Sequence, residues 1–329
     1  MRDAATFWDR EMTAPTHVSW LENDAVRRYV NRSMTGSETQ SAVEWFHERY
    51  PKRFARGLSI GCGGGGLERD LVRRGVCERI DAFDGSTGSL AIAQQEAQRA
   101  GLTPAIHYFA ADFNDPVLPP LTYDIVFVHQ ALHHVAELER LFAAILTTLK
   151  PGGLLWFDEY IGPSRFDWND RLIKPHRRTY DSLPADIRRQ PALLFPIQPD
   201  DPSEAYRSSE IMELLPVGFE TLERLDYGGN LLSVLFPAID WSQADPSLIE
   251  TLIAREEELL ARGAEPFHTV VVALAKEGRK REAAIRRYAR LAVRNRLRLR
   301  ARRGRRATEH FGRRLRATLR RRLGLAPRA

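Results

Sequence analysis

Short apolar runs and amphipathic segments alternate along the chain from residue 57 to residue 160. The apolar runs have the length of buried strands, and the segments between them place apolar residues at helical spacing. The predicted strands are a run that ends at Ile60, then Arg79–Phe83, Ala105–Ala110, Tyr123–Val128 and Leu154–Tyr160. The predicted helices are Leu67–Arg74, Ser89–Ala100 and Leu138–Leu149. This alternation predicts a doubly wound α/β fold, in which helices cover both faces of a mostly parallel sheet.

The segments on either side of this alternation are less regular. The N-terminal segment contains an amphipathic helix that ends near Pro51, and the segment after Tyr160 is rich in Pro, Asp and Arg and too long for an ordinary connection. Later predicted elements are a helix at Ser208–Leu215, a strand at Glu220–Leu225, a helix around Pro246–Arg262 and a strand at Phe267–Ala275. The predicted organisation is a helical cover at 1–56, a domain at 57–277 with insertions at 162–207 and 228–265, and an Arg-rich tail at 278–329.

A turn of almost pure glycine, from Gly61 to Gly66, separates the first predicted strand from the helix that follows it. Glycine accepts positive φ and lets a ligand approach the backbone closely. The free N–H groups at the start of the next helix favour an anionic or carboxylate-bearing ligand. The spacing Gly61-x-Gly63-x-x-Gly66 also satisfies the dinucleotide fingerprint, so the turn indicates the fold before it indicates the ligand.

Four stretches in the chain, taken together, resemble the class I S-adenosylmethionine-dependent methyltransferases. They are Gly61-Cys62-Gly63-Gly64-Gly65, Ile80-Asp81-Ala82-Phe83-Asp84, Phe109-Ala110-Ala111-Asp112-Phe113, and the segment 123–135 together with Leu149-Lys150-Pro151-Gly152-Gly153. The resemblance covers about residues 57–160, with the family's terminal strand pair near 219–227 and 267–275. It implies a Rossmann-like sheet of seven strands whose last strand inserts antiparallel, and S-adenosyl-L-methionine as the cofactor.

The resemblance also implies which residues bind that cofactor. Asp84 matches the acid that binds both ribose hydroxyls, and a carboxylate with two acceptor oxygens suits a vicinal diol. Asp112 matches the acid near the adenine amino group, with Phe113 beside the ring. Ser59 stands where the family usually has an acid, and Gly85 where many relatives have an apolar residue. The full predicted set is Ser59, Gly61, Cys62, Gly63, Asp84, Gly85, Asp112, Phe113 and Gln130.

Polar residues at the ends of the fourth and fifth predicted strands are candidates for the acceptor side of the site. His129, His133 and Glu159 are the predicted catalytic residues. A general base is needed only if the acceptor loses a proton during attack. The pair His133-His134 also has a structural interpretation, because it opens the segment after strand four in many relatives that have different acceptors.

Charge divides the chain into two parts. The 329 residues carry a net charge of +6, but residues 276–329 carry +19 and residues 1–275 carry −13. A basic tail on an acidic body predicts a polyanionic partner for the tail. Leucines at helical spacing favour an anionic membrane surface, and the scarcity of aromatic residues makes nucleic acid the weaker interpretation. A solvated tail without a partner is the remaining interpretation.

Other features of the sequence bear on location and chemistry. No apolar run approaches the ~18 residues of a membrane span, and the chain does not open on an apolar signal segment. Cys62 and Cys77 are the only cysteines and have no metal-ligand spacing, so no metal site is expected. We expect a cytoplasmic protein, with the tail as a candidate for peripheral attachment to the inner face of the membrane.

These patterns predict an enzyme that transfers a methyl group to a hydroxyl or amine of a small molecule or sugar. The stretch from Asp158 to Trp168 resembles methyltransferases of surface-glycan and natural-product biosynthesis. A nucleotide-dependent oxidoreductase is one alternative, which explains the glycine turn and Asp84 but leaves Asp112 unexplained. A cofactor-binding or scaffold protein without turnover is the other alternative, and the acceptor and the oligomeric state are not indicated by the sequence.

Overall fold

The structure is a computed structural model that describes residues 7–9, 19–195 and 201–297. The strands are β1 (Phe54–Ile60), β2 (Cys77–Asp84), β3 (Ile106–Ala110), β4 (Tyr123–His129), β5 (Leu149–Tyr160), β6 (Phe219–Gly228) and β7 (His268–Ala275). The α-helices are α2 (Asp24–Thr35), α3 (Ala42–Arg49), α4 (Gly66–Arg73), α5 (Thr87–Arg99), α6 (Leu138–Thr148), α7 (Asp170–Asp181), α8 (Ile211–Gly218), α9 (Leu232–Leu235) and α10 (Leu248–Ala261). Short 3₁₀ helices lie at Trp20–Glu22, Leu132–His134, Ala185–Ile187, Ser208–Glu210 and Phe236–Ala238.

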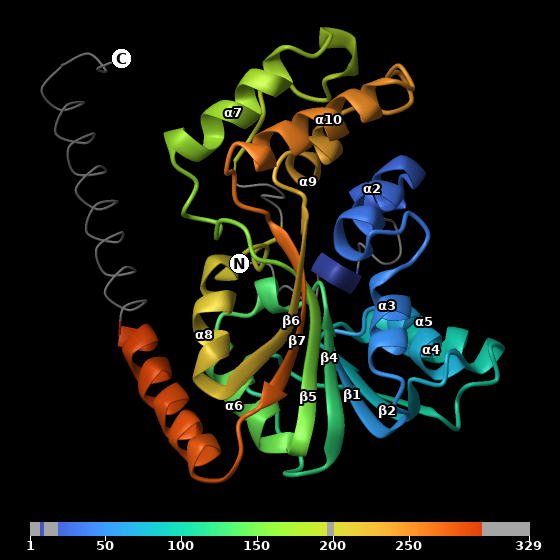
Figure 1. The fold of residues 1–329 in the computed structure, drawn as a ribbon, viewed down its shortest axis with the longest axis vertical. Helices are drawn as coiled ribbons and strands as arrows, with labels where there is room; N and C mark the ends of the chain where they lie inside the picture. Colours follow the sequence, from blue (N-terminus) through green and yellow to red (C-terminus); the bar gives the residue numbers. More distant parts are fainter. Residues whose placement is uncertain (1–6, 10–18, 196–200, 298–329) are drawn as a thin grey trace, which may run out of the picture.

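The sheet has the strand order β3-β2-β1-β4-β5-β7-β6 (Figure 1). The pairs β3–β2, β2–β1, β1–β4 and β4–β5 are parallel, whereas β7 runs antiparallel to both β5 and β6. This topology confirms the predicted doubly wound α/β fold and the antiparallel insertion of the last strand. The dinucleotide-binding sheet ends instead in the strand order 4-5-6 without such an inserted strand, which weighs against the oxidoreductase alternative.

Successive strand residues face opposite helical layers, because side chains alternate across a sheet. On one face, Phe127 of β4 and Trp156 of β5 pack around Phe46 of α3, together with residues of α4 and α5. On the other face, Val126 and Val128 pack against α6 and α8. The carboxyl ends of the parallel strands therefore open at one edge of a well-packed three-layer body.

The two insertions form a cap at this same end of the sheet, where Figure 1 places α7, α9 and α10. Helix α7 was not predicted, because its buried face is narrow and polar in composition. Asn169 caps its N-terminus by accepting hydrogen bonds from two backbone N–H groups, and His176 and Tyr180 fill its buried side. A tertiary contact of this kind leaves no clear apolar periodicity in the sequence.

A further helix at 278–297 packs on the α6 and α8 side of the sheet (Figure 1). Its apolar face is occupied, since Ala284, Tyr288 and Ala292 are buried. Tyr288 has no exposed surface and stacks on Phe142 of α6 at a centroid distance of 5.9 Å. The predicted tail therefore begins with a helix that belongs to the packed body, while residues 298–329 of the predicted tail lie outside the described residues.

Candidate functional site

A cavity of about 960 Å³ opens where β1, β2, β3 and β4 end. Residues from all four strand ends line it, together with the N-terminal Trp8 and the loop before α8. The lining includes Gly61, Gly63, Asp84, Gly85, Ser86, Asp112, Phe113, Asn114, Gln130, Ala131, His134, Ser203 and Tyr206. Every predicted cofactor residue except Ser59 and Cys62 is among them.

The glycine turn has the geometry that its sequence predicts. Gly61 has φ +73°, and a Cβ there would lie 2.3 Å from the Cβ of Ala131, so any side chain would clash. Gly63 has φ +48° and no atom within 4 Å of an added Cβ, so its backbone faces open space. The two glycines are thus required for different reasons, one for close packing and one for a left-handed backbone beside the cavity.

Asp84 holds the turn in place at the end of β2. Its Oδ2 accepts a hydrogen bond from the Gly63 N–H at 3.0 Å, and its Oδ1 accepts one from the Ser86 N–H at 2.8 Å. Burial raises the pKa of Asp84, although these hydrogen bonds oppose the shift. A carboxylate offers about four lone-pair sites, so each oxygen of Asp84 can still accept from a ligand hydroxyl in the cavity.

The second acid of the cavity, Asp112, follows β3. Its Oδ1 accepts hydrogen bonds from the backbone and side-chain N–H groups of Asn114, at 2.8 and 3.1 Å. Phe113 beside it packs on the buried Phe83, with ring centroids 5.8 Å apart. Asp84 and Asp112 are the only Asp or Glu residues in the described lining, which contains no Lys or Arg. The wall is therefore acidic.

Ser59 and Cys62 are buried and do not line the cavity. The Ser59 hydroxyl donates a short hydrogen bond to Oε1 of Glu68 on α4, and Glu68 has no exposed surface. The other carboxylate oxygen of Glu68 has no hydrogen-bond partner. The carboxyl group of Glu68, supplied by helix α4, thus lies beside Ser59, the strand position where the family usually has an acid. The strand sequence alone does not indicate this contact.

The predicted catalytic pair His133 and Glu159 is brought together after β4 and β5. Glu159 has no exposed surface and accepts hydrogen bonds from the N–H groups of Ala131 and Leu132, at 2.8 and 2.6 Å. Its Oε1 also bonds Nδ1 of His133. Burial opposes a charge on His133, but the attraction and hydrogen bond of Glu159 outweigh it and raise the pKa of His133 to about 9. Two of the predicted catalytic residues are thus in direct contact, and their catalytic roles stay predictions.

His129, the third predicted catalytic residue, lies outside this pair. Its Nε2 is 3.6 Å from Oδ2 of Asp158 on the neighbouring strand, and its side chain is 45% exposed. Asp158 also accepts hydrogen bonds from the hydroxyl of Tyr227 and, at 3.4 Å, from the amide of Gln130. Gln130 has φ +51°, a strained backbone for a residue with a side chain, and such strain is concentrated at functional sites.

The loop at 201–207 completes the far side of the cavity. His134 lies 3.1 Å from the Ser203 hydroxyl and 3.5 Å from Oδ2 of Asp201, measured from its Nδ1. Nε2 of His133 lies 3.8 Å from Oε2 of Glu204. Burial and the neighbouring His133 hold the pKa of His134 well below its usual value. Sequence reasoning missed these loop residues, because the irregular insertion carries no pattern that brings them to strand β4.

The N-terminal residues 7–9 lie beside the cavity, and Trp8 lines it. Asp9 accepts hydrogen bonds from the Ser86 hydroxyl at 2.6 Å and from the Gly88 N–H at 2.9 Å. Trp8 meets the ring of His134 edge-on at a centroid distance of 5.3 Å. The predicted N-terminal cover thus reaches the site itself, with one aromatic side chain in the cavity wall.

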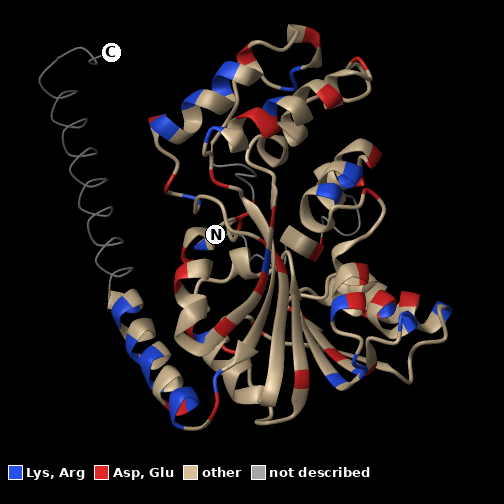
Figure 2. Ribbon diagram, viewed as in Figure 1, with Lys and Arg blue, Asp and Glu red and all other residues tan. Residues whose placement is uncertain are grey.

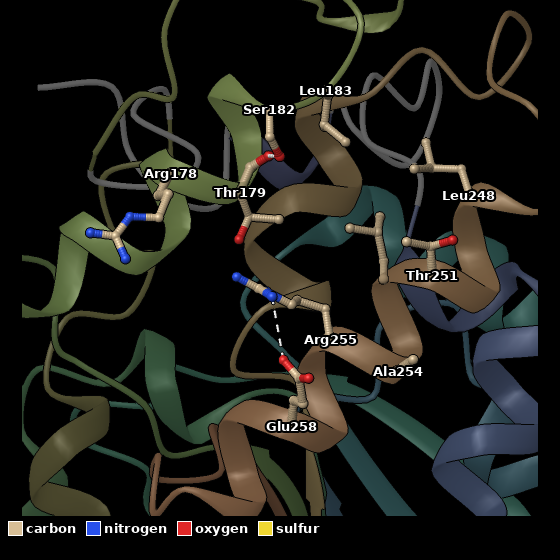
Figure 3. A pocket seen from close by; sticks show the side chains of 10 residues that line it. Arg178, Thr179, Ser182, Leu183, Leu248, Thr251, Ala254, Arg255 and Glu258 are labelled. Carbon is tan, nitrogen blue, oxygen red and sulfur yellow. Dashed lines mark hydrogen bonds and ion pairs between the residues drawn. The ribbon is translucent and has the colours of Figure 1, made fainter.

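A second hollow, of about 420 Å³, lies between α7 and α10 in the cap (Figure 3). Figure 3 shows Arg255 turned toward Glu258, with 3.3 Å between the charged groups, and Arg178 on the facing helix. None of the predicted site residues lines this hollow. The strand-end cavity is therefore the candidate active site.

Comparisons with known proteins agree with this geometry. Residues 58–157 match a protein-family model described as a methyltransferase domain. The chain is 29% identical to the sterol 24-C-methyltransferase of Clavispora lusitaniae over 140 residues, which are 42% of this chain and 37% of that protein. It is 33% identical to the ubiquinone biosynthesis O-methyltransferase of Burkholderia multivorans over 102 residues, which are 31% of this chain and 43% of that protein.

These matches cover only part of each protein, since the chain spans about two fifths of the length of these two curated relatives. The crystal structure of the SpnF cyclase is similar to the whole body, with a TM-score of 0.50, and the match covers 84% of this chain and 94% of that one. At 18% identity this likeness shows the fold alone.

Proposed function

Residues 58–157 form a class I S-adenosylmethionine-dependent methyltransferase domain, and on that premise we propose methyl transfer to a hydroxyl or amine of a small molecule or sugar. The observation that carries the proposal is the acidic strand-end cavity, which joins the glycine turn to His134, Ser203 and Tyr206. When bound, S-adenosylmethionine supplies a methyl group activated by a sulfonium. The acceptor oxygen or nitrogen bonds that methyl carbon, the C–S electron pair remains on sulfur, and the acceptor loses a proton.

The cavity suits this cofactor in charge. The sulfonium makes S-adenosylmethionine net cationic, and the carboxylates of Asp84 and Asp112 face a cation favourably. A nicotinamide dinucleotide would bring a pyrophosphate to a described lining that has two acids and no Lys or Arg. We therefore assign Asp84 to the ribose hydroxyls, Gly63 to the methionine part and Phe113 to the adenine face.

The acceptor side is assigned to the opposite wall. His134 and Tyr206 offer polar atoms, and the rings of Trp8 and Tyr206 offer aromatic faces that suit a sugar or a ring. The two curated relatives are named for methylation of a sterol and in ubiquinone biosynthesis, both small molecules. Surface-glycan or natural-product biosynthesis remains our proposal for the setting of the reaction.

We also propose a cytoplasmic enzyme whose basic C-terminal segment attaches to an anionic membrane surface. No helix in the described segments combines the length and hydrophobicity needed to cross a bilayer. Figure 2 shows Lys and Arg distributed along the helix at 278–297, and its apolar face is already packed. Val293 and Leu297 of this helix remain exposed. Attachment would therefore combine these apolar side chains with charge, and each basic residue near such a surface contributes about 1 kcal/mol.

Titration calorimetry with S-adenosylhomocysteine and with NADH tests the cofactor assignment. We expect binding of S-adenosylhomocysteine, and about 2 kcal/mol weaker binding in the Asp84→Asn variant, the scale of a hydrogen bond to a charged group. Asp115→Asn is the matched control, because Asp115 is exposed near Asp112 and does not line the cavity. Tighter binding of NADH, or unchanged affinity in a folded Asp84→Asn protein, would overturn the assignment.

Methyl transfer itself needs a separate measurement, because a protein of similar fold, SpnF, is named as a cyclase and not as a methyltransferase. The purified protein is incubated with S-adenosylmethionine that carries a labelled methyl group and with sugar, lipid-linked and small-molecule extracts. Label in an extract component identifies the acceptor. Cofactor binding without methyl transfer to any extract component would favour the alternative of a cofactor-binding or scaffold protein without turnover.

A further inference from the structure

His133, His134 and Glu204 form a cluster of donor atoms at the far wall of the cavity. One donor atom from each of the three side chains lies within 4.8 Å of the others. The two imidazole rings are 4.0 Å apart between centroids. Metal-bound donors at about 2.1 Å in a tetrahedron stand roughly 3.4 Å apart, so small side-chain movements would bring these atoms to a common ion.

The surroundings of the cluster have the arrangement that supports metal-binding histidines. A metal-binding histidine usually gives its other ring nitrogen to a carboxylate, carbonyl or water, which fixes the ring. Nδ1 of His133 bonds Glu159, which is itself anchored by the N–H groups of Ala131 and Leu132. This leaves Nε2 of His133 directed at Glu204.

A buried oxygen without a partner lies beside the same cluster. Asp201 has no exposed surface, and its Oδ2 accepts no hydrogen bond although it lies 3.5 Å from Nδ1 of His134. A buried polar atom left unsatisfied costs about 1–3 kcal/mol. Carboxylate oxygens of Glu159, Asp201 and Glu204 thus lie beside the nitrogens of two imidazoles, a mixed set of oxygen and nitrogen donors that suits a transition-metal cation.

The loop that carries Glu204 is held firmly against the histidines. The Tyr206 N–H donates to the carbonyl of His133 at 2.8 Å. The buried Arg207 donates to both oxygens of Glu139 on α6, at 2.7 and 2.8 Å. Ala205 has φ +47°, a strained backbone next to Glu204. The hydrogen bonds of Tyr206 and Arg207 hold the Glu204 carboxylate where it faces His133. They also maintain the strained backbone of Ala205.

From these contacts we propose that His133, His134 and Glu204 bind a divalent first-row transition-metal ion, with Asp201 as a further ligand or positioning residue. Imidazole together with carboxylate suits Zn²⁺, Fe²⁺ or Co²⁺, whereas Mg²⁺ prefers oxygen ligands throughout. This proposal departs from the expectation of no metal site, which rested on sequence spacing, because Asp201 and Glu204 lie about 70 residues from the histidines.

The position of the ion indicates a role in activating the acceptor, and this role rests on the proposed function. His134 and Ser203 share the cavity wall with the glycine turn and Asp84. An ion beside them would bind the acceptor hydroxyl and lower its pKa, so that the oxygen attacks with its proton already lost to solvent. This would favour hydroxyl acceptors over amines.

Metal binding is tested on the full-length protein after chelator treatment, without cofactor or acceptor. Calorimetry with Zn²⁺ and visible absorption with Co²⁺ should show one site per chain. We expect Glu204→Gln and His134→Ala each to weaken Zn²⁺ binding at least tenfold, and Asp201→Asn to weaken it by a smaller factor. His107→Ala is the control and should bind as the wild type does, since the His107 side chain is 73% exposed on β3.

Two results would overturn the metal site. One is the absence of a Co²⁺ absorption band in the wild-type protein, and the other is equal Zn²⁺ affinity in the wild type and a Glu204→Gln protein whose circular dichroism shows it folded. S-adenosylhomocysteine affinity is measured on the same samples, because Glu204 does not line the cavity. Loss of metal binding with retained cofactor binding separates this inference from the proposed function.

Discussion

Glu68 shows how the fold can bring a carboxyl group from a helix to a site where the sequence motif usually has an acid on the strand. The strand carries Ser59 where the family usually has an acid, and the carboxylate of Glu68 reaches the Ser59 hydroxyl from α4. Burial raises the pKa of Glu68, against the opposing effect of the Ser59 hydrogen bond. The folded state therefore favours the protonated form of Glu68 more than the unfolded state does.

This shift predicts a pH dependence of stability. Because the folded pKa lies above the unfolded value near 4.5, stability falls as pH rises from that value through the folded pKa. Glu68→Gln removes the titration. The free energy of unfolding of the variant should therefore rise relative to that of the wild type by up to about 1.4 kcal/mol per pH unit in that window. Urea unfolding at a series of pH values measures the difference.

The control for this series is Glu78→Gln, whose side chain is 53% exposed on β2. Its stability should follow that of the wild type at every pH. If the difference between Glu68→Gln and the wild type stayed constant from pH 4 to pH 8, titration of Glu68 would not be the cause.

Residues on local motifs were the predictable part of the site. These residues, Gly61, Gly63, Asp84 and Asp112, lie at or just after strand ends. Parallel strands bring their carboxyl ends to one edge of the sheet independently of the loop conformations. Their binding roles stay predictions, but the structure brings them to one cavity. Glu204 was not predictable, because its place depends on long-range hydrogen bonds such as that of Arg207 with Glu139.

At the scale of elements, Glu256 on α10 joins three segments that are distant in the chain. Its carboxylate accepts hydrogen bonds from the N–H groups of Gly229, Leu231 and Leu232, at 2.6, 3.0 and 2.7 Å. It also accepts one from the hydroxyl of Tyr29 on α2 at 3.1 Å. One buried carboxylate thus links helix α2, the turn after β6 and helix α10.

We expect Glu256→Ala to lower the free energy of unfolding by about 3 kcal/mol or more, because it leaves three buried N–H groups without acceptors. The neighbouring Glu257→Ala is the matched control. Glu257 is half exposed and pairs with Arg32 on the surface, where an ion pair contributes about 0–1 kcal/mol. Equal losses in the two variants, measured by urea unfolding, would contradict this role.

The elements themselves were predicted well where apolar periodicity is strong. Strand β7 was predicted from its run of Thr, Val, Ala and Leu, and its observed bounds, His268–Ala275, differ by one residue. Helix α10 was predicted within two residues of each end. Strand β5 begins five residues earlier than predicted, because Leu149 already pairs with Tyr123 of β4 and the residues up to Leu154 form an irregularity within the strand.

At the scale of the whole molecule, the first part of the basic tail is a helix that packs on the acidic body. The helix at 278–297 is joined to the body by Tyr288, whose hydroxyl donates to the carbonyl of Leu214 at 3.0 Å. Arg281 donates to the carbonyls of Leu149 and Lys150, at 2.7 and 3.2 Å. Two truncations therefore differ in what they remove, one at residue 297 and one at residue 277.

Truncation after residue 297 removes 13 Arg and one acid and leaves the packed helix intact. We expect the thermal unfolding temperature and S-adenosylhomocysteine affinity to stay as in the full chain, while binding to anionic vesicles falls sharply. Salt should weaken the binding of the full chain, because exposed charges are screened within about 8 Å at physiological ionic strength.

Truncation after residue 277 should also destabilise the body, because it removes Tyr288 from the core beside Phe142, a loss comparable to the ~3–5 kcal/mol of a large aromatic deletion. Vesicle co-sedimentation and thermal unfolding of both truncations, with RNA as a competitor, measure the two effects separately. Vesicle binding that survives truncation after 297 would contradict attachment through the tail. Tight RNA binding with a steep salt dependence would instead favour nucleic acid as its partner.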